Sequence, residues 1–235
     1  MKKFKILMAI AFLSVISTGM ADIVVDESII VYKDPAQTKY DVTVYNSDES
    51  SNLYLEVTPF KVANPGESNE TLEPLNYDSA PEFLVSPNRA IVAPDSPSIL
   101  RLLNLKNDGT EERIYRINLI PAIPPLELQP TGEPAVASML QVVVAYQILV
   151  IVLPTNPVAV IANDRQGNSA TFSNTGNANY LLTDGEQCDP ANPSMCVALE
   201  SKRIYPGNNW ILELPFNGPA SYTARTHEGS YPVAF

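Results

Sequence analysis

Short runs in which apolar and polar residues alternate follow one another along most of the chain, with turn-forming residues between them. A period of two is typical of β-strands that bury one face. Turn residues gather at Ala63 to Gly66 and at Asn107 to Gly109. The first half of the chain contains five clear runs, which predict strands at Ile23 to Tyr32, Tyr40 to Tyr45, Leu53 to Phe60, Ser98 to Leu105 and Arg113 to Ile120.

A second series of runs follows Pro154 and Pro157, and we place a domain boundary there. Helical periodicity is rare, and 21 prolines favour strands and turns. Antiparallel strands at this spacing are typical of immunoglobulin-like sandwiches. We therefore predict an all-β fold with two such domains, over residues 22–154 and, smaller, 155–235. The second would contain strands at Val158 to Asn163, Ser169 to Asn174, Ala178 to Thr183, Val197 to Ile204, Trp210 to Leu214 and Ser221 to Arg225.

The run from Met139 to Leu153 is unusually long. Seven of its fifteen residues are β-branched, which favours a strand over a helix. A strand of this length would extend about 50 Å, more than a small sandwich covers. Side chains alternate between the two faces of a strand. One face has no polar break; it carries Leu140, Val142, Val144, Tyr146, Ile148, Val150 and Val152.

Two interpretations of this run remain open. For Ile148 to Leu153 we favour burial in the core of the protein itself. For Leu140 to Tyr146, both core burial and an exposed edge are open. An exposed apolar edge is normally an aggregation hazard, so it would indicate a surface that pairs with a strand of another protein. Burying its four apolar side chains in a partner would gain roughly 1.5 to 3 kcal/mol each, before ordering costs.

The N-terminus has the pattern of a secretory signal peptide over residues 1–21. Three lysines precede an apolar run from Ile6 to Ile16, and Ala21 fits cleavage before Asp22. The run is too short to span a bilayer. After its removal 12 basic and 26 acidic side chains remain, a formal charge near −14. This charge repels phosphate backbones and argues against nucleic acid as a partner.

Other candidate chemistry is sparse. In an exported protein the pair Cys188 and Cys196 is most simply a disulfide; a metal site is the alternative, although no further Cys or His lies nearby. The single histidine, His227, is expected on the surface. The sequence contains no nucleophile elbow, phosphate-binding loop or cluster of metal ligands. We therefore predict a protein that is not an enzyme and uses no metal, cofactor or small-molecule substrate.

Several stretches resemble the periplasmic pilus chaperones of the chaperone–usher pathway, and look closest to the alternate branch that serves colonisation-factor pili. They are Val85 to Leu102, Glu112 to Pro125, Leu140 to Pro154, Ser173 to Asn177 and Tyr205 to Gly207. The resemblance implies two immunoglobulin-like domains in an L-shaped arrangement, and a periplasmic location. It also implies donor-strand complementation, in which the chaperone lends a strand to an incomplete pilin subunit and delivers the subunit to an outer-membrane usher.

By position in the resembling stretch, the donor side chains would be Leu140, Val142 and Val144, on the face that also carries Tyr146. In the family, a basic residue after the donor strand helps to hold the two domains. Leu153 takes its place here, which implies that the domains are held differently.

Typical members hold the C-terminal carboxylate of the subunit with an Arg on the first strand and a Lys on the donor strand. The matching positions here are Ile29 (or Ser28) and Leu149, and none of them is basic. Arg116 or Arg101 would be the substitutes, unless they are ordinary surface or salt-bridged arginines.

The alternative function is a secreted pilus or adhesin subunit with immunoglobulin-like domains. Such a subunit would carry an N-terminal extension of alternating apolar residues, whereas the segment from Asp22 to Tyr32 runs directly into the first domain. A secreted β-sandwich hydrolase is a third class, without a supporting residue. Self-association of the free protein through its long strand also remains open.

Overall fold

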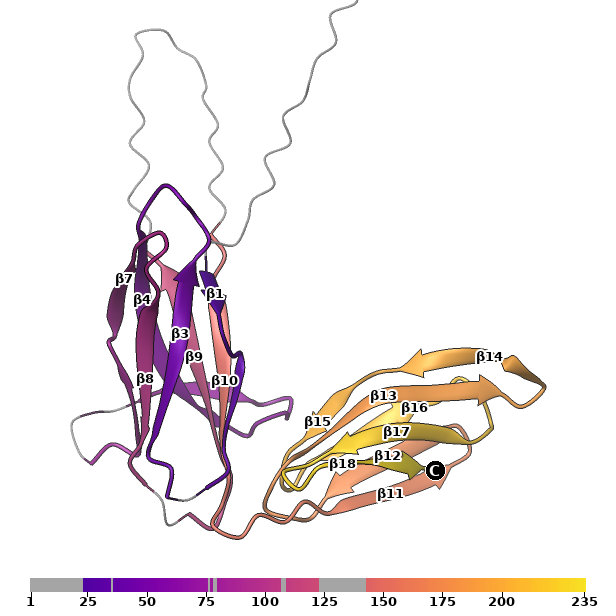
Figure 1. The fold of residues 1–235 in the computed structure, drawn as a ribbon. Helices are drawn as coiled ribbons and strands as arrows, with labels where there is room; N and C mark the ends of the chain where they lie inside the picture. Colours follow the sequence, from indigo (N-terminus) through magenta and orange to yellow (C-terminus); the bar gives the residue numbers. More distant parts are fainter. Residues whose placement is uncertain (1–22, 35, 76, 78–79, 107–108, 123–142) are drawn as a thin grey trace, which may run out of the picture.

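The protein consists of two β-sandwiches joined by a short connection (Figure 1). The structure is a computed structural model that describes residues 23–34, 36–75, 77, 80–106, 109–122 and 143–235. The predicted signal peptide therefore lies outside the described residues. Within these ranges we find no helix that is long and apolar enough to cross a membrane. The predicted fold class, two immunoglobulin-like sandwiches, is confirmed.

The first sandwich has a four-stranded sheet in the order β1-β3-β8-β6 and a six-stranded sheet in the order β2-β10-β9-β4-β5, in which β7 also pairs with β4. Its strands are β1 (Ile23–Val25), β2 (Ile29–Tyr32), β3 (Lys39–Asn46), β4 (Leu53–Ala63), β5 (Thr71–Pro74), β6 (Phe83–Ser86), β7 (Arg89–Val92), β8 (Ser98–Asn104), β9 (Arg113–Pro121) and β10 (Tyr146–Val152).

The second sandwich has a three-stranded sheet in the order β11-β12-β16 and a five-stranded sheet in the order β14-β13-β17-β18, in which β15 pairs with β13. Its strands are β11 (Ile161–Gln166), β12 (Ser169–Asn174), β13 (Tyr180–Asp189), β14 (Asn192–Leu199), β15 (Lys202–Ile204), β16 (Asn209–Glu213), β17 (Ala220–Arg225) and β18 (Ser230–Ala234).

Each sandwich has an aromatic-rich core of its own. In the first, the rings of Phe83 and Tyr115 stack with centroids 4.4 Å apart, and both side chains are fully buried. In the second, Phe172 packs edge-on against Tyr222 and Phe235. Because each sandwich buries its own inward-facing residues, each has the packing expected of an independent domain.

The single strand predicted over Ile23 to Tyr32 is wrong, since this segment forms β1 and β2 in different sheets. The cause is local. Asp26 Oδ1 accepts hydrogen bonds from the backbone N–H groups of Thr43 (3.0 Å) and Glu27 (2.9 Å), which ends the pairing of β1 with β3. The chain then crosses to the other sheet, where β2 pairs with β10 in parallel, although only antiparallel pairs were predicted.

Other differences concern short strands. The strand predicted over Val197 to Ile204 is interrupted after Leu199, so that β14 and β15 pair with different parts of β13. The strands β5, β6, β7 and β18 have no counterpart in the prediction. Three of them have four residues and one has five, which is too short for an alternating pattern to stand out.

The two sandwiches meet at one end and are set at a wide angle, which gives the molecule an L shape (Figure 1). An apolar cluster at the junction joins Ile151 and Leu153 of the first sandwich to Ala178 and Tyr205 of the second. Leu153, which stands where the resembling family has a basic residue, is thus part of an apolar interdomain contact.

Polar contacts support the same junction on two sides. Glu112 Oε2 accepts hydrogen bonds from the backbone N–H (2.9 Å) and side-chain amide (2.6 Å) of Asn179. On the other side, Asn208 Nδ2 donates to the carbonyl oxygen of Pro65 at 2.7 Å. Next to it Gly66 has φ +78°, and a Cβ there would come within 2.8 Å of the Tyr205 ring. Glycine at position 66 therefore permits this close approach.

Candidate functional site

The strand β10 differs along its length in the number of its neighbours. From Leu149 to Val152 it lies between β9 and β2, and every residue is paired on both sides. The inward-facing residues Ile148, Val150 and Val152 are buried in the core of the first sandwich. The core burial predicted for this half of the run is confirmed.

The beginning of β10 has a neighbour on one side only. Tyr146, Gln147 and Ile148 pair with β9, whereas β2 joins β10 at Leu149, whose N–H donates to the Ser28 carbonyl oxygen at 2.9 Å. Since backbone groups alternate in direction along a strand, the N–H and C=O of Gln147 point to the side that β2 leaves open. Among the described residues no strand pairs with β10 there. We call this side of residues 143–148 the open edge.

The open edge exists because β1 and β2 belong to different sheets. The segment before Asp26 pairs with β3, and only the segment after Ser28 reaches β10. Had the chain continued as one strand beside β10, it would have covered this position. The split that the sequence analysis missed is therefore what leaves the edge free.

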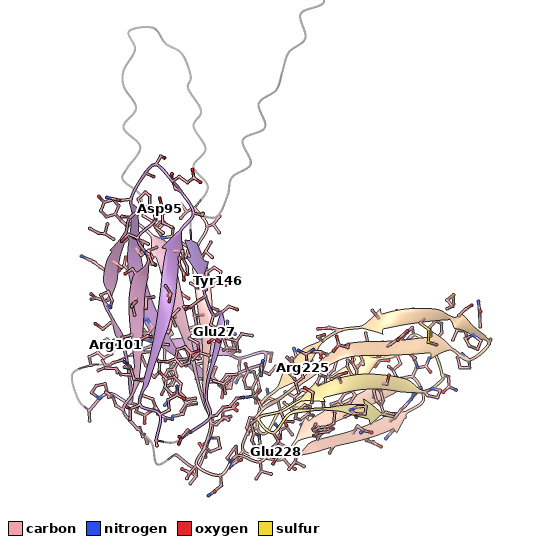
Figure 2. The ribbon with its side chains drawn as sticks, in the orientation of Figure 1. Glu27, Asp95, Arg101, Tyr146, Arg225 and Glu228 are labelled. Atoms are coloured by element: carbon pink, nitrogen blue, oxygen red, sulfur yellow. A yellow bond between two sulfur atoms is a disulfide. The ribbon has the colours of Figure 1, made fainter. Side chains whose placement is uncertain are left out.

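The predicted donor residues lie at or before this edge. Leu140 and Val142 lie outside the described residues. Val144 is 46% exposed, and Val143, which follows the opposite face, is 48% exposed. Tyr146 is half-buried against the core, and Figure 2 shows it on the margin of the first sandwich, away from the junction.

The regular strand begins later than predicted. Residues 143–145 have no strand pairing, so β10 starts at Tyr146 and not at Met139, as far as the described part of the run shows. The partner explains this start, because β9 ends at Pro121, which has no N–H to donate to a ladder.

The positions matched to the basic pair of the resembling family lie side by side. Leu149 is paired with Ile29 of β2 on one side and with Arg116 of β9 on the other. Residues opposite each other share a face, so Arg116 lies in the same row as these two positions. Its guanidinium forms an ion pair with Glu70 at 2.6 Å.

Arg101, the other predicted substitute, lies on β8 in the opposite sheet. Its guanidinium makes two hydrogen bonds to Asp41, at 2.8 and 3.0 Å. These bonds lower the pKa of the Asp41 carboxyl to about 2. Both substitutes are therefore engaged in ion pairs of their own, and a role of either in binding a carboxylate stays a prediction.

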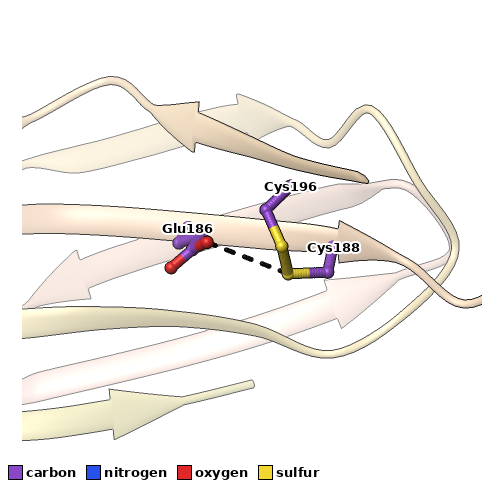
Figure 3. A group of neighbouring side chains, drawn as sticks. All are labelled: Glu186, Cys188 and Cys196. Carbon is purple, nitrogen blue, oxygen red and sulfur yellow. Dashed lines mark hydrogen bonds between the residues drawn. A yellow bond between two sulfur atoms is a disulfide. The ribbon is translucent and has the colours of Figure 1, made fainter. Parts of the chain in front are cut away.

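The cysteine pair forms a disulfide (Figure 3). Cys188 of β13 and Cys196 of β14 are directly opposite in the ladder. A carboxylate oxygen of Glu186 lies 3.9 Å from the Cys188 sulfur, which makes these three residues the one metal-ligand group found in the described ranges. Since both sulfurs are bonded to each other, neither is a thiolate that could bind a metal.

A cavity of about 210 Å³ lies where the two sandwiches meet. Lys33, just after β2, lines it from the first sandwich, and Arg203, Arg225 and His227 line it from the second. The expectation of a surface histidine is wrong, since the His227 side chain is only 15% exposed. Its turn between β17 and β18 packs at the junction, and no sequence signal marks that placement.

Comparison with known proteins gives a structural likeness without a match in sequence. No protein-family model matches the chain, and no curated protein matches it. The class 5 fimbriae chaperone CfaA superposes with a TM-score of 0.59 at 19% identity, over 90% of this chain and 98% of that chain. The Escherichia coli chaperone DraB superposes with a TM-score of 0.61 at 16% identity, over 91% of this chain and 96% of that chain.

A chain from the complex of the Salmonella enterica SafA pilin with the SafB chaperone gives a TM-score of 0.62 at 15% identity, over 93% of this chain and 98% of that chain. At such identities the likeness concerns the fold. Both sandwiches are included in it, because the superpositions extend over nine-tenths of the chain.

Proposed function

We propose that the protein is a periplasmic chaperone that binds pilin subunits by donor-strand complementation and delivers them to an outer-membrane usher. Residues 140–146 would lie as an added strand in the incomplete sandwich of the subunit, with Leu140, Val142, Val144 and Tyr146 filling its apolar groove. In this proposal the signal peptide directs the chain to the periplasm, and the domain boundary lies at Pro154.

The observation that carries the proposal is the open edge of β10. Over residues 143–147 it offers backbone groups that pair with no strand on the side of β2 among the described residues, next to the side chains of Val143 and Val144, which are about half exposed. An apolar strand with a free edge favours aggregation unless a partner strand covers it. Addition of a partner strand would pair the free backbone groups through hydrogen bonds and bury the exposed apolar side chains, and the alternate side chains would supply specificity.

The surrounding fold holds in place the part of the open edge that belongs to β10, residues 146–148. The same strand continues into the core, where Ile148 and Val150 are fully buried and β2 and β9 pair on either side. A client that adds to the open edge thus meets a strand whose direction and register are already fixed. Preorganisation of this kind lowers the entropy cost of binding.

The similar structures support a chaperone over a pilus subunit. Those named above are described as chaperones, CfaA as one of class 5 fimbriae, and the SafB structure contains the SafA pilin in complex with its chaperone. Both domains of this chain are matched over at least nine-tenths of its length. The proposal extends that shared fold to a shared role.

The proposal is tested by co-expression with a pilin encoded in the same gene cluster. The chain should form a soluble one-to-one complex, measured by size-exclusion chromatography with light scattering. Val144→Asp should weaken the complex at least 100-fold, because it places a charge in the apolar groove of the subunit. Val143→Asp is the matched control, since this neighbour is equally exposed but faces the other side.

Equal effects of the two substitutions would contradict a donor strand with one inserted face. The absence of any complex with the unmodified chain would contradict the chaperone proposal as a whole. Assembly of the purified chain into fibres would favour the alternative, a structural pilus or adhesin subunit. Denaturation curves of both variants should match the unmodified protein, because Val143 and Val144 lie outside the core.

A further inference from the structure

The second sandwich also has a strand with a free side. β14 forms the margin of the five-stranded sheet and pairs only with β13 within the part of the chain that the structure describes (Figure 1). Val197 of β14 lies opposite the buried Gln187, so its side chain points to the inner face of the sheet. It is nevertheless 39% exposed, because the facing sheet has only three strands and does not cover this margin.

The other three marginal strands of this sandwich carry features that discourage pairing with a further strand. β18 has Pro232 at its centre. β11 contains Asp164 and Arg165, and β16 ends in Glu213. Charged residues and proline are the usual protection of such edges. β14 contains no charged residue, and its one proline, Pro193, lies near its start, so its second half lacks that protection.

The spacing of two opposite residues shows which backbone groups of β14 are free. Cys188 and Cys196 face each other with Cα atoms 3.9 Å apart. A pair this close shares no backbone hydrogen bonds, so the N–H and C=O of Cys196 point away from β13. Since the direction alternates along a strand, the groups of Ala198 point the same way. No strand in the described ranges pairs with them.

Hydrogen bonds on the other side of β13 lead to the same assignment. Ala220 of β17 exchanges two backbone hydrogen bonds with Phe235, at 3.1 and 3.0 Å. Its groups therefore point away from its partner on β13, Gln187. The groups of Gln187 in turn point toward β14, where Val197 lies opposite. This pair is thus hydrogen-bonded, and the pairs on either side of it leave their outer groups free.

We propose that β14 pairs with β14 of a second copy of this chain, in antiparallel direction about a two-fold axis at Val197. In this register Cys196 of each copy lies opposite Ala198 of the other. Because both residues direct their backbone groups outward, the two pairs would form four hydrogen bonds. The exposed Val197 side chains of the two copies would meet at the axis and leave water together.

The charge distribution explains why this edge accepts a second copy of an acidic chain. The formal net charge is −11, so two copies repel each other over most of their surface. On the proposed axis, Glu200 comes beside Ser194 of the other copy and not beside an acidic residue. Glu186 and Asp189 lie on β13, and the two β13 strands would be about 14 Å apart, three strand spacings. Salt screens charges at that distance, since the Debye length is about 8 Å at physiological ionic strength.

The test is the oligomeric state of the purified chain without pilin, measured by sedimentation velocity. Two short strands bury a small area, so we expect a weak dimer that forms between about 10 µM and about 1 mM protein. Val197→Lys should weaken it at least about 10-fold, because two positive charges would meet at the axis. Val158→Lys is the matched control, since this exposed valine lies outside β14, and it should leave the dimer unchanged.

A second substitution addresses the backbone. Ala198→Pro removes an N–H that only the second copy would use, so it should weaken the dimer and leave the pairing of β14 with β13 in place. Urea denaturation followed by the fluorescence of Trp210, which stacks in the core of this sandwich, checks that both variants remain folded.

Amide hydrogen exchange, followed by NMR, tests the register. As the protein concentration rises, the amides of Cys196 and Ala198 should become protected. The amide of Val197 should change little, because it is already bonded to Gln187 in the single copy. Protection at Gln147 of β10, with none at Cys196, would overturn the inference.

The remaining outcomes are equally clear. A chain that stays monomeric up to about 1 mM overturns the inference. A dimer that Val144→Asp abolishes and Val197→Lys leaves intact would be formed by the open edge of β10, and overturns it as well. Equal effects of Val197→Lys and Val158→Lys would show a response to net charge and not a contact at β14. Because no pilin is present, the proposed function and this inference can each fail without the other.

Discussion

The strand β10 and the segment just before it have the same kind of sequence and opposite environments. Ile148, Val150 and Val152 are buried between two neighbouring strands, whereas Val143 and Val144 are about half exposed beside an open edge. Hydrophobicity does not separate them. The number of neighbouring strands does, and it is set by the point at which β2 joins the sheet.

This comparison shows how one strand can serve both stability and binding. The buried end fixes the direction and register of the strand, and the open end extends that register to a partner. A purely exposed strand would have to be ordered on binding, at a cost in conformational entropy. Separating the two tasks along one strand means that each can be tested by substitution without affecting the other.

The largest effect on stability is expected at the buried end. Ile148→Ala should lower the free energy of unfolding by about 2 to 5 kcal/mol, because it leaves a cavity in the core of the first sandwich. Val144→Ala, the matched change at the open end, should alter it by no more than about 0.5 kcal/mol. Urea denaturation followed by circular dichroism measures both.

The order should reverse for binding. Val144→Ala should weaken the pilin complex, whereas Ile148→Ala should leave it intact at low temperature, where the protein remains folded. Similar losses of stability at both positions would mean that Val144 belongs to the core, and the distinction between the two ends would fail.

A second edge strand is also exposed, but it is secured in a different way. The edge strand β14 is exposed along almost its whole length, including Met195 and Val197, and it has one neighbour, β13. Here the disulfide between Cys188 and Cys196 ties the edge strand to its neighbour. Replacing both cysteines by Ser should destabilise the second sandwich by about 2 to 3 kcal/mol, given the short loop that the bond closes.

The single tryptophan gives a local measurement of this effect. Trp210 stacks on Phe172 in the second core, so its fluorescence reports the unfolding of that sandwich. Reduction of the disulfide in the unmodified protein should lower the midpoint of this unfolding transition as much as the double Ser substitution does. An unchanged midpoint in both would mean that the ladder between β13 and β14 holds without the bond. Pilin binding should be unaffected, because the bond joins β13 and β14 of the second sandwich, and β14 lies on the side of that sandwich away from β10 (Figure 1).

The sequence predicted those parts of the fold that depend on local pattern. Alternation located most of the long strands, and the pairing of Cys188 with Cys196 followed from their isolation in the chain. It also identified the apolar run that contains β10 and assigned core burial to Ile148 through Leu153. These features depend on side-chain periodicity and on composition, which are visible without coordinates.

The features that could not be predicted from the sequence depend on contacts between distant segments of the chain. The split between β1 and β2 follows from Asp26 binding the backbone of Thr43, 17 residues away. The cavity brings Lys33 together with Arg203, Arg225 and His227, about 170 or more residues later in the chain. No local pattern identifies such groupings, because each residue alone has the composition of an ordinary surface.

The smallest expected effect concerns the contact between the two sandwiches at Glu112, which lies near the C-terminal end of β10. Glu112 precedes β9, opposite the end of β10, and its Oε2 accepts two hydrogen bonds from Asn179. Burial raises the pKa of the Glu112 carboxyl, and the bonds from Asn179 and the charge of Arg203 oppose that rise. Its Oε1 is buried without a partner among the described residues.

The sign of the pH dependence follows from the raised pKa of Glu112. The folded protein holds this proton more tightly than the unfolded chain, whose glutamate pKa is about 4.3. The stability that Glu112 contributes is therefore complete below that value and is lost as the pH rises through the folded pKa. Glu112→Gln keeps the acceptor for Asn179 and does not ionise. Between pH 4 and pH 8 the unmodified protein should thus lose stability relative to the variant, roughly a 1 kcal/mol effect or less for one partly compensated group. A gain of the unmodified protein over the variant across this range would show that the charge of Arg203 outweighs burial at the domain contact.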